Sequence, residues 1–197
     1  LQQFSTPLGL AFVAAPAAMI EPGDVVLEPS AGTGMLAVHA ELMRANLVLN
    51  ELSETRAALL SKIMGAPVSK HDAASIDDRL PVGHRPTIVL MNPPFSAIAH
   101  VDRAMKDAAL RHIASALARL EPGGRLVAIT SATCCPENGN WRAAFEALQR
   151  SGRIVFTTAI DGRIYRKHGT TIETRLTVID KVPAEDPAKN VPSAGIA

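Results

Sequence analysis

The sequence predicts an α/β fold, in which a twisted and mostly parallel sheet is flanked by helices on both faces. Short continuous apolar runs, typical of buried parallel strands, alternate along the chain with segments whose apolar residues repeat about every 3.6 positions. The last strand-like segment instead alternates apolar and polar residues, as an outer strand does. Since the connection before it is long enough for a hairpin, we expect this strand to run antiparallel.

The elements follow one another after an N-terminal lead-in. The expected strands are 24–28, 47–51, 68–71, 87–91, 125–130, 153–160 and 171–182. The expected helices are 34–44, 54–64, 101–120 and 141–150, with Trp141 in the core and a loop from 72 to 86. In open sheets of this kind, ligands bind at the carboxyl ends of the strands.

Bulk properties fit one domain and exclude several classes of protein. The chain has 197 residues, 47% of them hydrophobic, which is enough for one sizeable core, expected over 1–182 with a linker-like tail over 183–197. No apolar run reaches the ~18 residues of a membrane span, and no signal peptide opens the chain, so we expect a cytoplasmic protein with no membrane partner. The adjacent Cys134 and Cys135 lack metal-ligand spacing, and we assign no metal.

A glycine loop follows the first expected strand. It reads Glu28-Pro29-Ser30-Ala31-Gly32-Thr33-Gly34 and fits, with Ala37, the dinucleotide pattern of a strand, a tight turn and a helix. Glu51 closes the second strand about 20 residues later, where an acid accepts hydrogen bonds from ribose hydroxyls. This loop predicts a nucleotide-like cofactor.

Glu28 decides which cofactor is favoured. A carboxylate at the mouth of the loop would repel a pyrophosphate, which disfavours an NAD oxidoreductase. S-adenosylmethionine carries an ammonium and a sulfonium that suit Glu28, a ribose for Glu51 and an adenine. Asp72, just after the third strand, is placed to accept from the adenine amino group, with Ala73 beside it. We therefore expect S-adenosylmethionine.

The tetrapeptide Asn92-Pro93-Pro94-Phe95 ends the fourth strand. Two prolines stop the strand abruptly and fix the backbone, so an amide and an aromatic ring project at its end. An exocyclic amine such as N6 of adenine is a poor nucleophile. The Asn92 oxygen and the Pro93 carbonyl can accept its hydrogens and align it with a methyl donor, and Phe95 offers a stacking face for a flipped-out base. We predict these four residues, Pro94 included, to be catalytic.

Together with Phe4-Ser5-Thr6-Pro7 near the N-terminus, these motifs resemble class I S-adenosylmethionine-dependent methyltransferases of the N6-adenine type. More narrowly, the chain resembles the methylase domain found beside Strawberry-notch-type helicases in mobile elements. The resemblance implies a Rossmann-like, seven-stranded sheet, transfer to adenine in DNA, and a covalently linked helicase. It also implies that Phe4 and Thr6 lie near the methionine part of the cofactor, Glu51 at its ribose and Asp72 at its adenine.

Other substrates fit the same tetrapeptide. Guanine in ribosomal RNA and glutamine in a protein are compatible planar amines or amides, and an inactive cofactor-binding module serving a helicase is a third alternative. The net charge of +1 does not indicate a protein that grips nucleic acid over its whole surface. Between 153 and 175, however, Lys and Arg exceed acids, so Tyr165, Arg166 and Lys167 are expected to contact substrate, with an ordinary solvated hairpin tip equally compatible.

Overall fold

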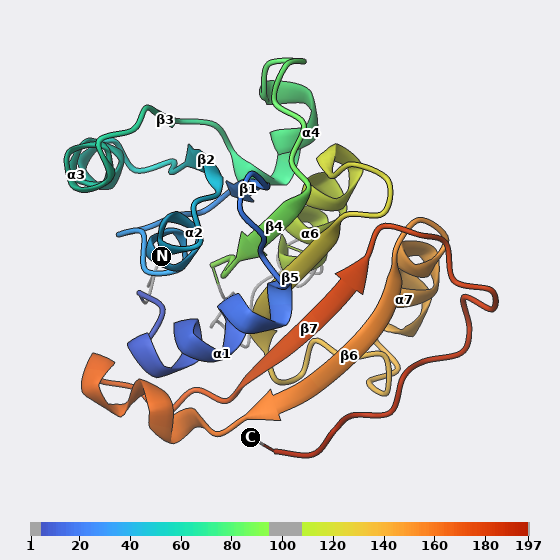
Figure 1. Ribbon diagram of the computed structural model, residues 1–197. Coiled ribbons are helices and arrows are strands. Elements are labelled where there is room, and N and C mark those ends of the chain that lie inside the picture. The colour runs from blue at the N-terminus through green and yellow to red at the C-terminus, as the bar shows by residue number, and fades with distance from the viewer. Residues whose placement is uncertain (1–4, 95–107, 197) are drawn as a thin grey trace.

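A computed structural model describes residues 5–94 and 108–196 of the chain (Figure 1). Its strands are β1 Val25–Glu28, β2 Asn46–Asn50, β3 Val68–Ser69, β4 Ile88–Met91, β5 Arg125–Ser131, β6 Arg153–Ile160 and β7 Thr174–Asp180. Its α-helices are α1 Leu8–Ala18, α2 Ala37–Leu42, α3 Glu54–Met64, α4 Ile76–Arg79, α6 Ala108–Arg119 and α7 Arg142–Gln149. Two short 3₁₀ helices, η1 Ala73–Ser75 and η2 Gly162–His168, complete the series.

The strands form one seven-stranded sheet in the order β3-β2-β1-β4-β5-β7-β6. The pairs among β1 to β5 are parallel, whereas β7 lies antiparallel between β5 and β6. This confirms the predicted sheet with its antiparallel last strand. The chain order reverses at β1, which has β2 on one side and β4 on the other, and such switch points open a crevice at the carboxyl ends of the strands.

Helices cover both faces of the sheet because successive strand residues point to opposite sides. Val26 and Leu90 face one core, which α1, α2 and η2 complete, whereas Leu27 and Met91 face the other, beneath α4, α6 and α7. Helix α1 packs against β4 and β5, and Figure 1 shows it in front of the lower end of β5. A smaller cluster beneath α3 includes Leu60. The two apolar layers hold the strand ends, and hence the crevice, in fixed positions.

Two expectations about elements were wrong. The expected lead-in holds α1, whose sequence is apolar on every side and includes Pro16, so no helical period marks it. The expected loop over 72–86 contains η1 and α4, both too short to show a period. The β6–β7 connection, for which no element was expected, contains η2. Residues 101–107 of the helix expected over 101–120 lie outside the described residues.

The segment after β7 contacts the outer strand β6. The Ala159 N–H donates to the Gly195 carbonyl at 3.1 Å, the Ala194 N–H donates to the Thr157 carbonyl at 2.9 Å, and the buried Gln149 amide donates to the Pro187 carbonyl at 2.8 Å. Figure 1 shows this segment returning beside β6. Within the described ranges, no helix has both the length and the apolarity to cross a bilayer.

Candidate active site

Four predicted site residues lie at the carboxyl ends of adjacent strands. Glu28 ends β1, Glu51 follows β2, Asp72 lies beyond β3 and Asn92 follows β4. Because the sheet order in this region is β3-β2-β1-β4, the residues occupy neighbouring positions along one edge, in the order Asp72, Glu51, Glu28, Asn92. The edge is the one at which the crevice opens, so the topology brings these predicted residues together.

The glycine loop after β1 is shaped by two positive φ angles. Gly32 has φ 56° and Gly34 has φ 84°, both in the left-handed region that side chains disfavour. A Cβ on Gly34 would lie 2.6 Å from Leu60 Cδ1, so this glycine is also needed for α3 to pack against the loop. A Cβ on Gly32 would meet no atom within 4 Å, which leaves open space above the loop for a ligand.

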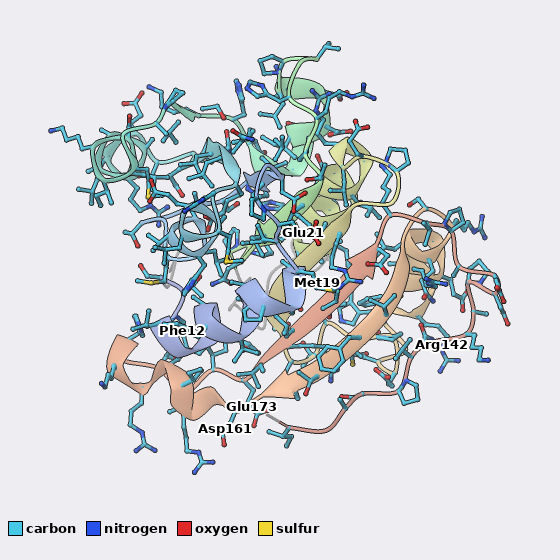
Figure 2. All side chains as sticks on the ribbon, in the orientation of Figure 1. Phe12, Met19, Glu21, Arg142, Asp161 and Glu173 are labelled. Atoms are coloured by element: carbon cyan, nitrogen blue, oxygen red, sulfur yellow. The ribbon has the colours of Figure 1, made fainter. Side chains whose placement is uncertain are left out.

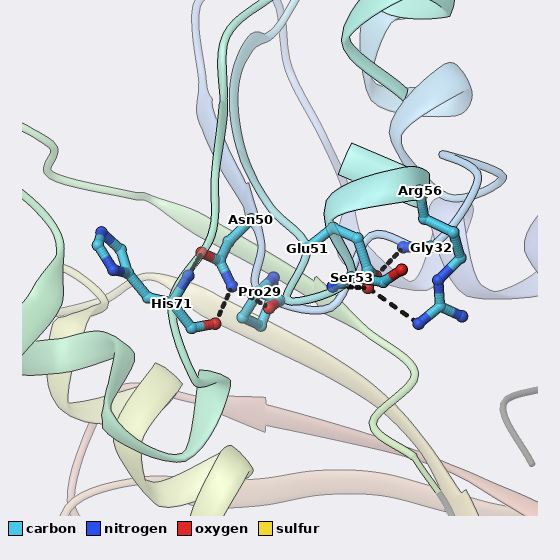
Figure 3. A network of polar contacts seen from close by, with 7 residues as sticks. All are labelled: Pro29, Gly32, Asn50, Glu51, Ser53, Arg56 and His71. Carbon is cyan, nitrogen blue, oxygen red and sulfur yellow. Dashed lines mark hydrogen bonds and ion pairs between the residues drawn. The ribbon is translucent and has the colours of Figure 1, made fainter. Parts of the chain in front are cut away.

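Glu51 fastens the glycine loop to the end of β2 (Figure 3). Its Oε2 accepts from the Gly32 N–H at 2.9 Å, while its Oε1 accepts from the Ser53 N–H at 2.8 Å and from Arg56 Nη2 at 2.9 Å. The side chain is only 4% exposed. Since a carboxylate oxygen has two lone pairs, Oε2 keeps one acceptor position beside Gly32.

Asn50, which the sequence analysis missed, ties three strand ends together (Figure 3). Its fully buried amide donates to the Pro29 carbonyl at 2.8 Å and to the His71 carbonyl at 2.9 Å. Its oxygen accepts from Ser69 Oγ at 2.8 Å and from the His71 N–H at 2.9 Å. Every hydrogen-bonding position of the amide is used, so Asn50 fixes the loops that carry Glu28 and Asp72. The only signal in the sequence is an amide that ends an apolar run.

Glu28 is buried and incompletely hydrogen-bonded. It is 3% exposed, and among the described residues its Oε2 has no hydrogen-bond partner. Burial raises the pKa of this carboxyl well above its usual value; the Ala37 N–H lowers the pKa, and the charge of Glu51 raises it. A buried acceptor without a partner is unfavourable, so this position favours a cationic or hydrogen-bond-donating group beside it.

Asp72 begins η1 and stands near a histidine that the sequence analysis did not select. Its Oδ1 accepts from the Ala74 N–H at 2.9 Å as an N-terminal cap, and the residue is exposed, with Ala73 buried beside it. His112 of α6 has a buried Nδ1 without a hydrogen-bond partner among the described residues. Burial lowers the pKa of His112, whereas the Asp72 charge raises it and the Arg111 charge lowers it.

The loop after β4 is attached to the N-terminal segment. Asn92 Nδ2 donates to Thr6 Oγ1 at 3.0 Å, which brings two predicted site residues together across most of the first half of the chain. Thr6 and Pro93 are buried, and Pro94 is half-buried. Phe4 and Phe95, also predicted site residues, lie outside the described residues.

Fewer residues of the predicted substrate-contacting segment are exposed than the sequence suggested, and Tyr165 is one of the buried ones. Tyr165 is 0% exposed and packs in the core beneath η2, so a ring that closes over a base from a solvated tip is not what the structure shows. Arg175 is also buried, where it donates to Thr157 Oγ1 at 3.0 Å. Arg166 and Lys167 are exposed on η2, the orange segment at the lower left of Figure 1.

No family model and no curated protein matches this sequence. Solved structures match over most of it. The M protein of the type I restriction enzyme EcoKI superposes with a TM-score of 0.74 at 18% identity, over 94% of this chain and 45% of that one. A candidate class I S-adenosylmethionine-dependent methyltransferase from Listeria monocytogenes superposes with a TM-score of 0.74 at 12% identity, over 97% and 65%. For a candidate RNA methyltransferase from Pyrococcus horikoshii the TM-score is 0.67 at 24% identity, over 92% and 88%.

The chain has the Rossmann-like class I methyltransferase fold. It spans less than half of the EcoKI M protein and 65% of the Listeria protein, but most of the Pyrococcus protein. In this fold the three acids lie at the ends of β1, β2 and β3, as Glu28, Glu51 and Asp72. Asn92 follows β4, on the other side of the switch point. A ligand held by the three acids would therefore lie next to the loop after β4.

Proposed function

We propose that the chain is an S-adenosylmethionine-dependent methyltransferase that transfers a methyl group to an exocyclic amine, N6 of adenine in DNA. One observation carries the proposal: three acids and the Asn92-Pro93-Pro94 loop follow four adjacent strands, on either side of the switch point. The three acids suit a cofactor with cationic, ribose and adenine parts. The amide and prolines suit a planar amine.

The described residues fit this cofactor. The unpartnered Glu28 oxygen offers an acceptor to the ammonium and sulfonium groups, and the free position on Glu51 Oε2 offers one to the ribose. Asp72 is exposed, with Ala73 beside it, where it would accept from the adenine amino group, and a Cβ on Gly32 would meet no atom within 4 Å, so the loop is open on that side. Pro29, Ser30 and Gly34 belong to the same loop, and Thr6 is held at the loop after β4 by its hydrogen bond from Asn92. When bound, S-adenosylmethionine supplies an electrophilic methyl group on its sulfonium.

Asn92 and Pro93 would prepare the acceptor nitrogen. Conjugation with the ring delocalises the lone pair of the amine, and two acceptors that take its hydrogens draw the lone pair out and orient it. The amide of Asn92 gives its Nδ2 to Thr6, which leaves Oδ1 to accept from the substrate. Fixed acceptors of this kind act by positioning and electrostatics, and no general base is needed before transfer. Phe95 completes the proposal as the stacking face for the base.

DNA is the first candidate substrate, because the sequence resembles N6-adenine enzymes and the EcoKI M protein is among the structural neighbours. RNA is the second, because the Pyrococcus neighbour is a candidate RNA methyltransferase and the match covers 88% of that chain. Arg166 and Lys167 on η2 would contact phosphates of either polymer. We further propose, from the sequence resemblance alone, that a helicase domain is covalently linked to this chain. The reading frame of the longer protein tests that linkage.

Cofactor binding is tested by calorimetric titration with S-adenosylmethionine and, separately, with NAD. We expect binding of the first only, and Glu51→Ala should weaken it by about 1.5–3 kcal/mol, the scale of charge-assisted hydrogen bonds. Glu54→Ala is the matched control, since its side chain is 86% exposed and pairs only loosely with Lys70 at 3.6 Å.

Thermal melting of each variant checks that it folds. Unchanged affinity in folded Glu51→Ala would remove Glu51 from the ribose site. Binding of NAD in preference to S-adenosylmethionine, or no binding of S-adenosylmethionine by the folded wild-type chain, would contradict the proposal itself.

A further inference from the structure

Tyr165 is a buried polar residue to which the proposed chemistry assigns no role. It is the only tyrosine of the chain, it is 0% exposed, and its ring packs in the core formed by α1, α2 and the sheet. Its hydroxyl oxygen is buried and, among the described residues, has no hydrogen-bond partner. A buried hydroxyl without a partner is unfavourable, and such a group in a packed core calls for an explanation.

Tyr165 lies on a segment that packs against the start of α1, close to Thr6: a Cβ on Gly9 would lie 3.6 Å from Cδ1 of Ile164, the residue before Tyr165. Burial raises the pKa of this phenol to about 12, and the two side chains that lower it are those of Thr174 and Asn92. Thr174 begins β7, and its Oγ1 is also buried without a partner in the described part of the chain. A phenol with this pKa stays protonated at neutral pH. Tyr165 is therefore a hydrogen-bonding group and not a proton acceptor in the reaction.

The hydrogen-bonding positions of Asn92 leave one donor unassigned. An amide nitrogen carries two hydrogens and the oxygen has two lone pairs. One hydrogen is directed at Thr6 Oγ1, at a distance of 3.0 Å between the heavy atoms. The other needs an acceptor, and the Tyr165 hydroxyl, whose pKa the Asn92 side chain lowers, is a buried oxygen without a partner among the described residues. If both amide hydrogens are bound to protein oxygens, the orientation of the amide is fixed. Asn92 Oδ1 is then left to accept a hydrogen bond from the substrate.

We propose that Tyr165 is a positioning residue: its hydroxyl, together with that of Thr6, holds the two amide hydrogens of Asn92 and so directs Asn92 Oδ1 at the amine that is methylated. This inference rests on the proposed function for its catalytic part, but the contact itself does not. Thr6 precedes α1 and Tyr165 lies on η2, so segments from opposite ends of the chain orient the loop after β4.

The contact is tested by solvent exchange of the Asn92 side-chain amide hydrogens, measured by NMR on protein with ¹⁵N-labelled asparagine. Loss of one resonance pair in Asn92→Asp assigns the signal. In Tyr165→Phe, which removes only the hydroxyl, one of the two hydrogens should exchange at least about tenfold faster, and in Thr6→Val the other should. Thr177→Val is the matched control, because it removes another buried hydroxyl from β7 and should leave both rates unchanged. Unchanged exchange in Tyr165→Phe would overturn the contact.

The positioning role is tested by methyl transfer at saturating cofactor. Tyr165→Phe should lower kcat about tenfold, in the range of second-layer partners, with the Kd for S-adenosylmethionine and the KM for nucleic acid unchanged. An unchanged kcat, or a parallel loss of cofactor affinity, would overturn this role even if the exchange rates respond. If the wild-type protein transfers no methyl group, the proposed function fails, while a faster exchange in Tyr165→Phe still supports the contact.

Discussion

At the scale of single residues, two neighbouring carboxylates at the sheet edge have different surroundings. Glu51 accepts from two backbone N–H groups and from Arg56, so its negative charge is balanced within the protein. Glu28 is equally buried but has an oxygen without a partner in the described part of the chain, and its pKa is raised. Glu28 therefore destabilises the empty site, and a cationic ligand would relieve this.

Glu28→Gln should stabilise the protein in a pH-dependent way. A raised native pKa contributes stability below the unfolded value, near 4.5, and that contribution is lost as the pH rises through the native pKa. The neutral Gln carries no such penalty, so its advantage in melting temperature over wild type should be near zero below the unfolded pKa and grow as the pH rises above it. Each unit of pKa shift corresponds to about 1.4 kcal/mol.

The same Glu28→Gln variant should bind S-adenosylmethionine more weakly, because the charge opposite the cationic groups is lost. Glu41→Gln, an exposed acid on α2, is the control for both measurements. A melting difference between Glu28→Gln and wild type that does not vary with pH would mean that Glu28 is ionised normally in the folded protein.

At the scale of elements, the sequence predicted correctly the helices and strands whose apolar pattern is clear. The helix Glu54–Met64 and the strand Arg153–Ile160 match the expected ranges at both ends, because their apolar periodicity and flanking residues are clear. The positions of Glu28, Glu51 and Asn92 at strand ends were predicted for the same reason. The sequence did not reveal α1, because this segment is apolar on every side. Only packing against the sheet determines which face of the helix is buried.

Long-range partners explain the residues that the sequence analysis missed or misplaced. Asn50 acts through Pro29 and His71, each about 20 positions away, so no short pattern indicates its role. Tyr165 was expected to contact substrate because basic residues surround it. In the structure the turn of η2 points Tyr165 into the core and leaves Arg166 and Lys167 outside.

The exposed basic residues of η2 give a prediction for that element. Arg166→Ala combined with Lys167→Ala should weaken nucleic-acid binding and reduce the slope of log affinity against log salt by up to about two, one for each phosphate contact. Cofactor affinity should not change. The matched control is Arg142→Ala combined with Lys189→Ala, which removes one exposed Arg and one exposed Lys elsewhere; Arg142 lies at the far right of Figure 2. A wild-type salt slope in the η2 double variant would show that these residues are simply solvated.

At the scale of the whole molecule, the sheet order turns separate motifs into one site. β1 and β4 are neighbours although about 60 residues separate them, and the switch point between them, where sheets of this kind form a crevice, has the acids on one side and Asn92 on the other. The net charge of +1 gives the surface no general attraction for nucleic acid, so the proposed nucleic-acid substrate would have to be held by local contacts. The central claim is therefore that a base enters this crevice and presents its amine to Asn92.

Methyl transfer by Asn92→Ala tests that claim most directly. Labelled S-adenosylmethionine is supplied with single-stranded DNA, duplex DNA, RNA or protein extract, and the products are resolved by nucleoside and amino-acid analysis. Asn46→Ala is the control, since Asn46 is an exposed asparagine at the opposite end of β2. We predict label in N6-methyladenine of DNA, a loss of about a hundredfold or more in rate for Asn92→Ala, and unchanged cofactor binding. Label in methylguanine or methylglutamine would change the substrate, and an undiminished rate in Asn92→Ala, or no transfer to any substrate by the wild-type protein, would contradict the account.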